Sequence, residues 1–306
     1  MFQFIVRRLL QTIPVVIGVT LLVFSLMHLI PGDPAQIIAG ESAQPRQVEL
    51  MRERLGLNDP VYVQYVRYMR NLLQGDMGQS IRSSRNVVDE IKPRFWITVK
   101  LAIYSTMLSV FIGLTAGVFS AVRRYGLADS TIMVVALFGL SMPNFWLGLM
   151  LIQFFSIELS LLPPSGWGTW KQTILPVITL GTGGAAIIAR VTRSSMLEVI
   201  NQDYIRTARA KGLSERLVIY KHALKNAMIP VITVVGLELG VLLSGTVLTE
   251  TVFSINGMGR LVIFSIGARD FPVVQGVVLI FALLFVLVNF LVDISYRYFN
   301  KRVDLN

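Results

Sequence analysis

Residues 201–230 read NQDYIRTARAKGLSERLVIYKHALKNAMIP, a basic and polar segment in a chain that is otherwise mostly apolar. The segment holds six Lys and Arg residues but only two acids, Asp203 and Glu215. Apolar stretches long enough to cross a bilayer lie on both sides of it. A polar segment of this length between two membrane spans indicates a contact either with lipid headgroups or with a partner protein.

The composition excludes several classes of protein. Hydrophobic residues make up 54% of the 306-residue chain and charged residues 15%, whereas soluble domains are about one quarter charged. Several long apolar runs therefore predict a polytopic membrane protein. The net charge of +10 is spread over the segments between these runs, which indicates basic cytoplasmic loops rather than nucleic-acid binding. The chain has no cysteine, and its two histidines, His28 and His222, lie too far apart to predict a metal site.

Six membrane spans are predicted, at residues 9–30, 97–122, 131–159, 175–189, 229–249 and 273–295. The first follows Arg7 and Arg8 and lacks a small-residue cleavage site, so we expect an uncleaved span rather than a signal peptide. A polar insertion follows it, with short helices predicted at 47–55, 61–73 and 87–91, and residues 250–272 are expected to form a loop. The chain then divides into an N-terminal transmembrane helix, an insertion and a core domain of five spans, at residues 1–30, 31–95 and 96–306.

The distribution of basic residues predicts the orientation in the membrane. Fifteen Lys and Arg residues lie at the two termini and in the loops of one side, against three in two short loops of the other. Because cytoplasmic loops carry the basic excess, both termini and residues 201–230 are expected in the cytoplasm. The insertion at 31–95 is then extracytoplasmic, and it is long enough for its own basic residues to carry little weight.

The third and fourth spans contain irregular residues. Proline kinks a helix by removing a backbone hydrogen bond, and in lipid the freed carbonyl needs a protein partner or a cavity. Pro143 and Asn144 therefore mark either a packing kink or a kink that lines a transport path. Small residues in the fourth span would let another helix approach closely: Gly181, Gly183, Gly184, Ala185 and Ala186.

Glu238 lies near the middle of the fifth span, where a carboxylate is costly and marks a function by default. It could contact a substrate amine, carry a proton, or make a structural hydrogen bond across a dimer. Glu158, Glu250 and Asp293 lie near the ends of spans and are expected at the membrane interface.

Within the basic segment the pattern predicts two helices. Asn201 or Asp203 can cap the first, which continues through residues 204–211 and stops at Gly212, and Ser214 can cap the second. One face of the first helix carries Tyr204, Thr207, Ala208 and Lys211. The two small residues in its middle would let that face enter a groove on a partner. Contact with anionic headgroups is the alternative.

Residue patterns add a family resemblance. Thr207-Ala208, Gly212, the HALKN of 222–226 and Pro230 resemble the EAA loop of bacterial ABC-transporter permeases. YIRTARAKGL with KHALKNAMIPV resembles the permeases that import dipeptides, oligopeptides, glutathione and nickel. The resemblance extends over nearly the whole chain. It includes PGDPA at 31–35, LGLNDPVYVQY at 55–65, SMPNFWLG at 141–148, ILPVITLG at 174–181 and RDFPVVQG at 269–276.

Two departures from the family pattern are visible. Arg206 stands where the generic EAA motif has glutamate, as is common in this subfamily, and Asn256 stands where the family usually has proline before glycine. Asn-Gly is still a turn former, so the shape of that loop is expected to survive.

The resemblance implies an all-α membrane protein with six transmembrane helices, the type I ABC importer permease fold and a small extracytoplasmic helical insertion. It implies a heterodimer with a second homologous permease, two cytoplasmic ATP-binding subunits and an extracytoplasmic substrate-binding protein, in the bacterial inner membrane. The coupling loop would be residues 190–228, with ATPase contacts at Tyr204, Arg206, Thr207, Ala208, Lys211 and Gly212. The chain has no GxxxxGK[ST] loop, so ATP and Mg²⁺ are expected on the ATPase subunits and no cofactor on this chain.

These patterns predict a permease subunit, itself not an enzyme, that imports di- or oligopeptides by alternating access. Glutathione, nickel or a metallophore are alternative substrates, and the translocation path is expected at Glu238, Pro143 and Asn144. A secondary transporter working alone would predict inverted repeats, and no convincing internal repeat is present. A membrane-bound enzyme would need an acid–base or metal constellation, which the sequence lacks.

Overall fold

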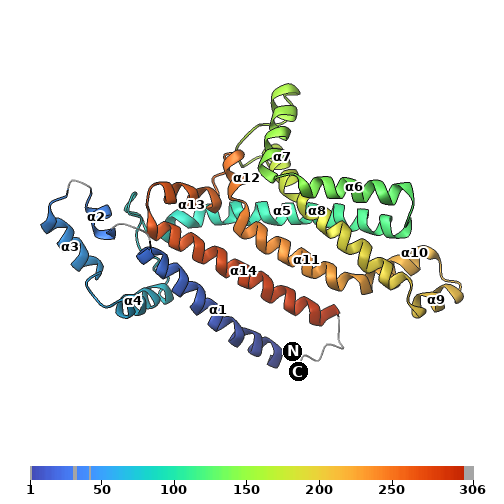
Figure 1. The fold of residues 1–306 in the computed structure, drawn as a ribbon, viewed down its shortest axis with the longest axis horizontal. Helices are drawn as coiled ribbons and strands as arrows, with labels where there is room; N and C mark the ends of the chain where they lie inside the picture. Colours follow the sequence, from blue (N-terminus) through green and yellow to red (C-terminus); the bar gives the residue numbers. More distant parts are fainter. Residues whose placement is uncertain (1, 30–32, 41–42, 300–306) are drawn as a thin grey trace. The chain divides into compact units, whose positions relative to one another are not determined.

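A computed structural model describes residues 2–29, 33–40 and 43–299 and is helical almost throughout (Figure 1). The only pairing of extended backbone among these residues is an isolated bridge between Gln79 and Asn86. The helices are α1 (Phe2–Leu29), α2 (Pro34–Ala39), α3 (Pro45–Leu55), α4 (Val61–Leu73), α5 (Val87–Val122), α6 (Leu127–Ser141), α7 (Asn144–Leu151), the π-helical η1 (Ile152–Glu158), α8 (Trp170–Ile200), α9 (Asp203–Ala210), α10 (Glu215–Leu217), the π-helical η2 (Val218–Ala223), α11 (Leu224–Gly245), α12 (Val247–Val252), α13 (Met258–Gly267) and α14 (Phe271–Phe299).

Five stretches of the described chain are long and apolar enough to cross a membrane: Val6–Ser25, Val87–Val122, Trp170–Ile200, Glu215–Ser244 and Phe271–Ser295. The six predicted spans are reached if Leu127–Ser141 and Asn144–Glu158 count as one broken span. The predicted end of the first span at Ile30, the residues Pro31 and Gly32, and the C-terminal Lys301 and Arg302 lie outside the described residues.

The third span is broken rather than kinked. Its two halves meet at an angle of 100°. Met142 and Pro143, the two residues that separate the halves, both have extended backbone torsions. Proline disfavours the helical conformation in the residue before it, which explains why α6 ends at Ser141. Pro143 then serves as the N-cap position of α7, so the helix restarts immediately in a new direction.

The chain divides into two compact units, residues 1–96 with 257–284 and residues 97–256 with 285–306. In the first unit α1 packs against α4, where the hydroxyls of Thr20 and Tyr65 lie 2.9 Å apart. The side-chain amide of Gln275 in α14 also donates to the Val23 carbonyl oxygen in α1 at 3.0 Å. Two polar contacts therefore fix α1 against its neighbours in this unit.

The helices predicted at 47–55 and 61–73 in the insertion are confirmed as α3 and α4. Gly56 ends α3 with a φ of 65°, a left-handed conformation that glycine adopts without a steric cost. The short helix predicted at 87–91 is wrong in extent, because it forms the first turns of α5, which continues through Pro93 to Val122.

Residues 250–272 are not the loop that the sequence predicts. The end of α12 and the whole of α13 lie in this segment. Glu250, expected at the membrane interface, is fully buried within this chain, and its Oε1 atom accepts hydrogen bonds from Thr98 at 2.7 Å and Thr246 at 2.9 Å. Hydroxyl donors from α5 and from the junction between α11 and α12 therefore compensate for the burial of this carboxylate.

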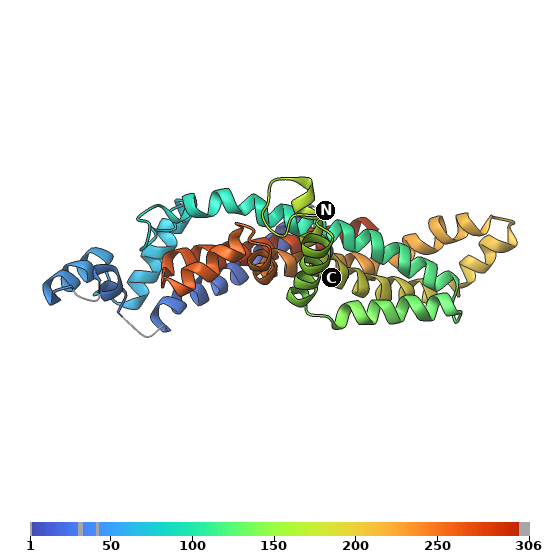
Figure 2. The same ribbon diagram turned by 90° about the horizontal axis from the view of Figure 1, so that it is seen from above.

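In the second unit α8 lies among its neighbours and packs against α6, α7 and α11 (Figures 1 and 2). Where α5 crosses α8, a Cβ atom on Gly113 would lie 2.9 Å from the Ala185 carbonyl oxygen, and one on Gly117 would lie 2.6 Å from that of Ala189. On α8 itself, a Cβ atom on Gly181 would lie 3.1 Å from the Ser105 carbonyl oxygen. The predicted close approach along the small residues of α8 is confirmed.

This approach predicts the effect of adding one methyl group. Gly117→Ala is expected to lower the free energy of unfolding by about 1–3 kcal/mol, because the backbones of α5 and α8 must move apart. The measurement is an SDS titration of the purified chain. Gly139→Ala is the matched control in α6, where a Cβ atom meets nothing within 4 Å, and it should leave stability unchanged or slightly raised. Equal stability of the two variants would contradict the close contact.

Candidate functional site

The basic segment folds as one short helix followed by a continuous helical stretch. Gly212 has a φ of 78° and ends α9 as predicted, and α10, η2 and α11 then run on without a break. The predicted caps are wrong in part. Gln202 occupies the N-cap position of α9 and Asp203 is its first residue, where an acidic side chain still favours the helix dipole. Ser214 holds the N-cap position of α10, but its side chain makes no capping hydrogen bond.

A buried apolar cluster, which we call the loop core, attaches α9 to the rest of the second unit. The helix α9 contributes Ile205 and Ala208 to this cluster. These two residues are three positions apart, on one side of the helix, and are almost fully buried. The other members come from α5, α8, η2 and α11: Val118, Ala121, Met196, Val218, Ile219, Ala223 and Ala227. The side chain of Ala208 is thus covered by this chain, which leaves it little surface for the predicted contact with a partner.

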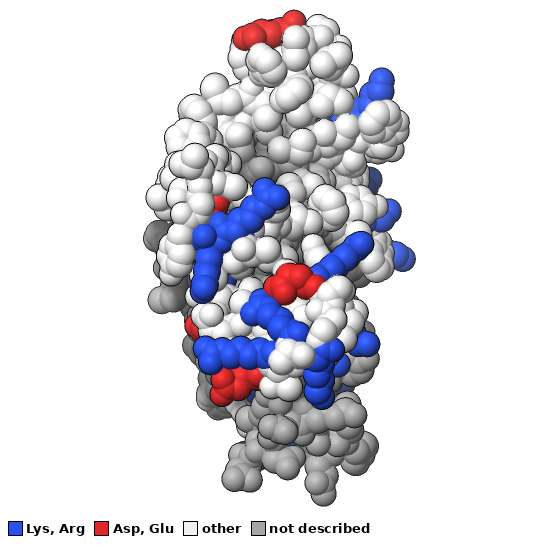
Figure 3. All heavy atoms as spheres, turned by 90° about the vertical axis from the view of Figure 1, so that its right-hand side faces the viewer, with Lys and Arg blue, Asp and Glu red and all other residues white. Residues whose placement is uncertain are grey.

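The opposite side of α9 is exposed. Tyr204, Arg206, Thr207 and Lys211 all lie on the surface, and we call these four residues the α9 outer face. Tyr204 is 43% exposed, and its hydroxyl accepts a hydrogen bond from the side-chain amide of Asn226 at 2.9 Å. Figure 3 views the molecule from the side where α9 and α10 lie in Figure 1, and among its charged side chains Lys and Arg cover more of the surface than Asp and Glu.

A salt bridge closes the turn after α9. Arg209 donates to both carboxylate oxygens of Glu215, at 2.7 and 3.1 Å, across the turn that contains Gly212. These hydrogen bonds raise the pKa of the Arg209 guanidinium above its ordinary value. Sequence reasoning missed this pair and the contact from Asn226, because neither has the i, i+4 spacing that marks partners on one helix.

A second, more buried ion pair joins α8 to α6. Arg193 donates from Nε and Nη2 to the two carboxylate oxygens of Asp129, each at 2.7 Å. The same carboxylate accepts from the Tyr125 backbone N–H at 2.9 Å and from the Ser120 hydroxyl. Four donors thus fix Asp129, which is almost completely buried, and join the turn between α5 and α6 to α8.

The predicted path residues meet α8 at two neighbouring glycines. A Cβ atom on Gly183 would lie 3.6 Å from Asn144 Oδ1, at the start of α7. A Cβ atom on Gly184 would lie 2.8 Å from Glu238 Oε1 and 2.7 Å from the Ser109 hydroxyl oxygen. The break after Pro143 and the carboxylate of α11 therefore approach the same short stretch of α8.

Glu238 is partly exposed, and no described residue of this chain forms a hydrogen bond or ion pair with its carboxylate. Ser109, which sequence reasoning missed, lies beside the same glycine but donates to the Gly181 carbonyl oxygen at 2.8 Å. A carboxylate in this position is free to accept a hydrogen bond from a substrate, from water or from another subunit.

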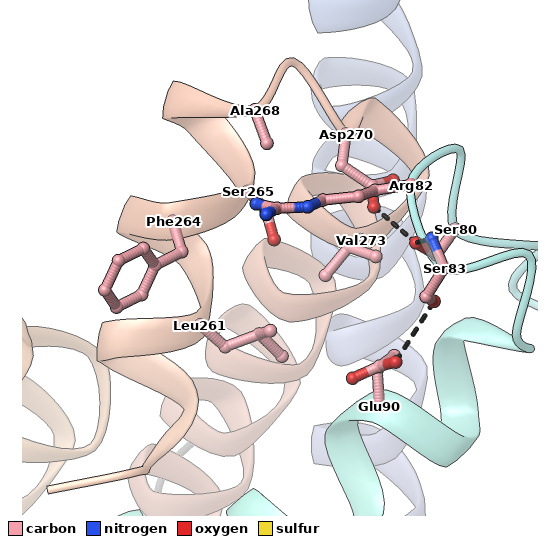
Figure 4. Close-up of a pocket in the computed structure, with 10 residues that line it drawn as sticks. All are labelled: Ser80, Arg82, Ser83, Glu90, Leu261, Phe264, Ser265, Ala268, Asp270 and Val273. Atoms are coloured by element: carbon pink, nitrogen blue, oxygen red, sulfur yellow. Dashed lines mark hydrogen bonds between the residues drawn. The ribbon is translucent and has the colours of Figure 1, made fainter. Parts of the chain in front are cut away.

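The first unit contains a cavity of about 120 Å³ between the turn at 80–83, α5, α13 and α14 (Figure 4). Asp270 accepts hydrogen bonds from the Ser80 hydroxyl and the Ile81 backbone N–H, and Arg82 extends across the cavity toward Ser265. The RDFPVVQG motif thus contributes a buried carboxylate that holds the turn of the insertion in place.

Comparison with known proteins covers nearly the whole chain. Residues 113–305 match a family described as the binding-protein-dependent transport system inner membrane component, and residues 1–102 match the N-terminal family of the same systems. The dipeptide transport system permease protein DppB of Alkalihalophilus pseudofirmus is 46% identical, over 99% of each chain. The glutathione transport system permease protein GsiC of Escherichia coli K12 is also 46% identical over 99% of each chain.

Solved structures show the same fold at lower identity. The inward-facing MetNI methionine ABC transporter aligns with a TM-score of 0.59 at 22% identity, covering 69% of this chain and 96% of the other. An amino acid ABC transporter aligns with a TM-score of 0.54 at 15% identity, covering 68% and 94%.

The buried ion pair generates a prediction about stability. Asp129→Asn is expected to lower the free energy of unfolding by about 2–3 kcal/mol, since it leaves Arg193 without its countercharge. The loss should fall below that of a fully buried pair because the Arg193 side chain is 24% exposed. Denaturant titration of the purified chain measures this loss of stability. Asp203→Asn is the control, because the ion pair of Asp203 with Arg206 is exposed and its N–O distance is 3.6 Å. Equal stability of both variants would contradict a structural role for Asp129.

Proposed function

The chain belongs to the inner membrane components of binding-protein-dependent transport systems, and we propose that it imports short peptides, glutathione among them. It is a permease subunit of an ABC importer, a multi-pass protein of the inner membrane that works with an ATPase and a binding protein. The permease is not catalytic and has no cofactor of its own, since the ATPase partners bind ATP.

The substrate proposal rests on one observation: the sequence of this chain is equally identical to permeases of two kinds of transport system. The dipeptide and glutathione permeases are each 46% identical to this chain over 99% of its length. Glutathione is itself a tripeptide, so both names describe small molecules with an amine, carboxylates and amide groups. The shared chemistry supports a path that accepts short peptides, while the binding protein selects among them. Nickel and metallophores remain alternative predictions.

The proposed assembly pairs this chain with a second, homologous permease above two ATPase subunits. Both termini and the α9 outer face lie in the cytoplasm, on the evidence of the basic residues. The α9 outer face and Gly212 contact an ATPase, whereas Ile205 and Ala208 attach α9 to its own permease. The carboxylate of Glu238, which has no partner among the described residues, faces the substrate path or the second permease.

The contacts within the second unit suggest how movement of α9 reaches the path during alternating access. The loop core joins α9 to α5, α8 and α11, and the pair of Asp129 with Arg193 joins α8 to the start of α6. At the far end of α6 the chain breaks at Pro143, beside Gly183 and close to where Glu238 meets α8. A displacement of α9 would therefore act on both sides of the path through rigid helices.

Uptake by the reconstituted importer tests the substrate proposal. Vesicles that contain the permease pair, the ATPase subunits and the binding protein should accumulate a labelled dipeptide or glutathione when ATP is supplied. Accumulation should stop when ATP or the binding protein is left out. Uptake of neither compound, with ATP hydrolysis still stimulated by another ligand of the binding protein, would overturn it.

Variants of α9 test the coupling proposal separately. Thr207→Trp adds bulk to the α9 outer face and is expected to reduce uptake at least tenfold while the purified permease keeps its thermal stability. Ala208→Trp should instead lower that stability, because it overfills the loop core. Lys221→Ala, an exposed position on η2, is the control and should retain uptake. Normal uptake by Thr207→Trp would place the ATPase contact elsewhere.

Glu238→Gln separates the roles left open for this carboxylate. A proton-carrying or amine-binding role predicts at least a tenfold loss of uptake at saturating binding protein. A structural hydrogen bond across the permease pair predicts retained uptake, because glutamine keeps an acceptor of similar size. The two outcomes are read from initial uptake rates together with co-purification of the second permease.

A further inference from the structure

A groove of about 650 Å³ lies between α5 and the stretch formed by α10, η2 and α11. Its walls are largely apolar, with Leu114 and Val118 on one side and Ile219 and Leu224 on the other. These four side chains are buried or partly covered, whereas Phe119, Val122 and Tyr220, which also line the groove, are 42%, 45% and 59% exposed. The groove is large enough for part of a lipid-sized ligand.

Two arginines add positive charge to this apolar groove. Arg123 directly follows the candidate span Val87–Val122, and Arg216 is the second residue of the candidate span Glu215–Ser244. Both cations therefore lie at the ends of helices that are apolar enough to cross a membrane, where a long basic side chain can reach the lipid headgroups. The Arg123 guanidinium lies 4.4 Å from the centre of the Phe119 ring, which holds its position and leaves its N–H groups available.

Unlike Arg193 and Arg209, these two arginines have no anionic partner among the described residues. Arg193 and Arg209 each form a two-pronged salt bridge with a carboxylate. Among the described residues no acidic side chain pairs with Arg123 or Arg216, and the groove is lined by no acidic residue. The local charge is therefore uncompensated within the chain and complements an anion.

We infer that this groove binds an anionic phospholipid, with its phosphate between Arg123 and Arg216 and the upper part of an acyl chain against the apolar walls. Guanidinium groups bind phosphate oxygens in pairs, and the walls would shield acyl carbons from water. A soluble phosphate compound would leave the apolar walls uncovered. The inference goes beyond the proposed import function and depends only on the chain's place in a membrane.

The bound lipid would also touch the attachment of α9. Val118 and Ile219 line the groove and belong to the loop core that holds Ile205 and Ala208. A lipid on one side of these residues should therefore stabilise the position of α9, and its loss should loosen the segment.

Native mass spectrometry of the purified full chain tests the inference. The probes are phosphatidylglycerol and phosphatidylcholine with identical acyl chains. Retention of phosphatidylglycerol by the Arg123→Gln/Arg216→Gln variant should fall roughly 25-fold, about fivefold for each arginine. The matched control, Lys221→Gln/Lys225→Gln, removes the same charge from exposed positions outside the groove and should change retention less than twofold. Phosphatidylcholine should bind weakly to every form.

Three results would overturn the inference. An equal loss in both double variants would indicate diffuse attraction without a site. Displacement of phosphatidylglycerol by millimolar inorganic phosphate would indicate a site for free anions. Unchanged lipid retention with lost co-purification of the ATPase subunits would identify the groove as a protein contact. If the double variant does not fold, Arg216→Gln alone, at an exposed position of α10, should still lower retention about fivefold, and no loss would reject the site.

Discussion

The absence of side chains at a few glycines lets α8 lie directly against α5 and α11, and the rest of the second unit depends on this contact. Lipid supplies no hydrophobic force between helices, so close packing and polar contacts must hold them together. Gly113 and Gly117 bring α5 onto α8, and Gly184 makes room for the Glu238 carboxylate. Once α8 is fixed in this way, it positions Asn144 at one face, Glu238 at another and Arg193 near its end.

Polar groups then give this packing its specificity. Asp129 and Glu250 are both buried carboxylates, and each accepts hydrogen bonds from more than one segment of the chain. Such groups are costly without partners, so they favour a single arrangement of the helices that provide them. The carboxylate of Glu238 is the contrast, since no described residue of the chain satisfies it. A group that the permease itself leaves unsatisfied is suited to interactions that change during transport.

Features with a local chemical signal could be predicted from the sequence. Gly56 and Gly212 stop helices because they take positive φ, and Pro143 breaks the third span because proline restricts its neighbour. The matches over the whole chain confirm the family resemblance that the motifs indicated. Contacts between distant residues could not be predicted, as Arg193 and Asp129 show. The burial of Ala208 depends on which face of α9 the later η2 covers. The helix α13 was missed because ten residues are too few to form a span.

The contact of Gly184 with Glu238 has a consequence for how this sequence can diverge. An alanine at position 184 would overlap the carboxylate oxygen, with 2.8 Å between the added Cβ and Oε1. A shorter side chain at position 238 would remove this overlap but not the one with the Ser109 hydroxyl oxygen, which would lie 2.7 Å from the added Cβ. Positions 109, 184 and 238 are therefore constrained together, and a side chain at 184 meets a steric cost until both of its neighbours change. The absence of a side chain at position 184 of α8 thereby leaves room for the carboxylate of Glu238 on α11.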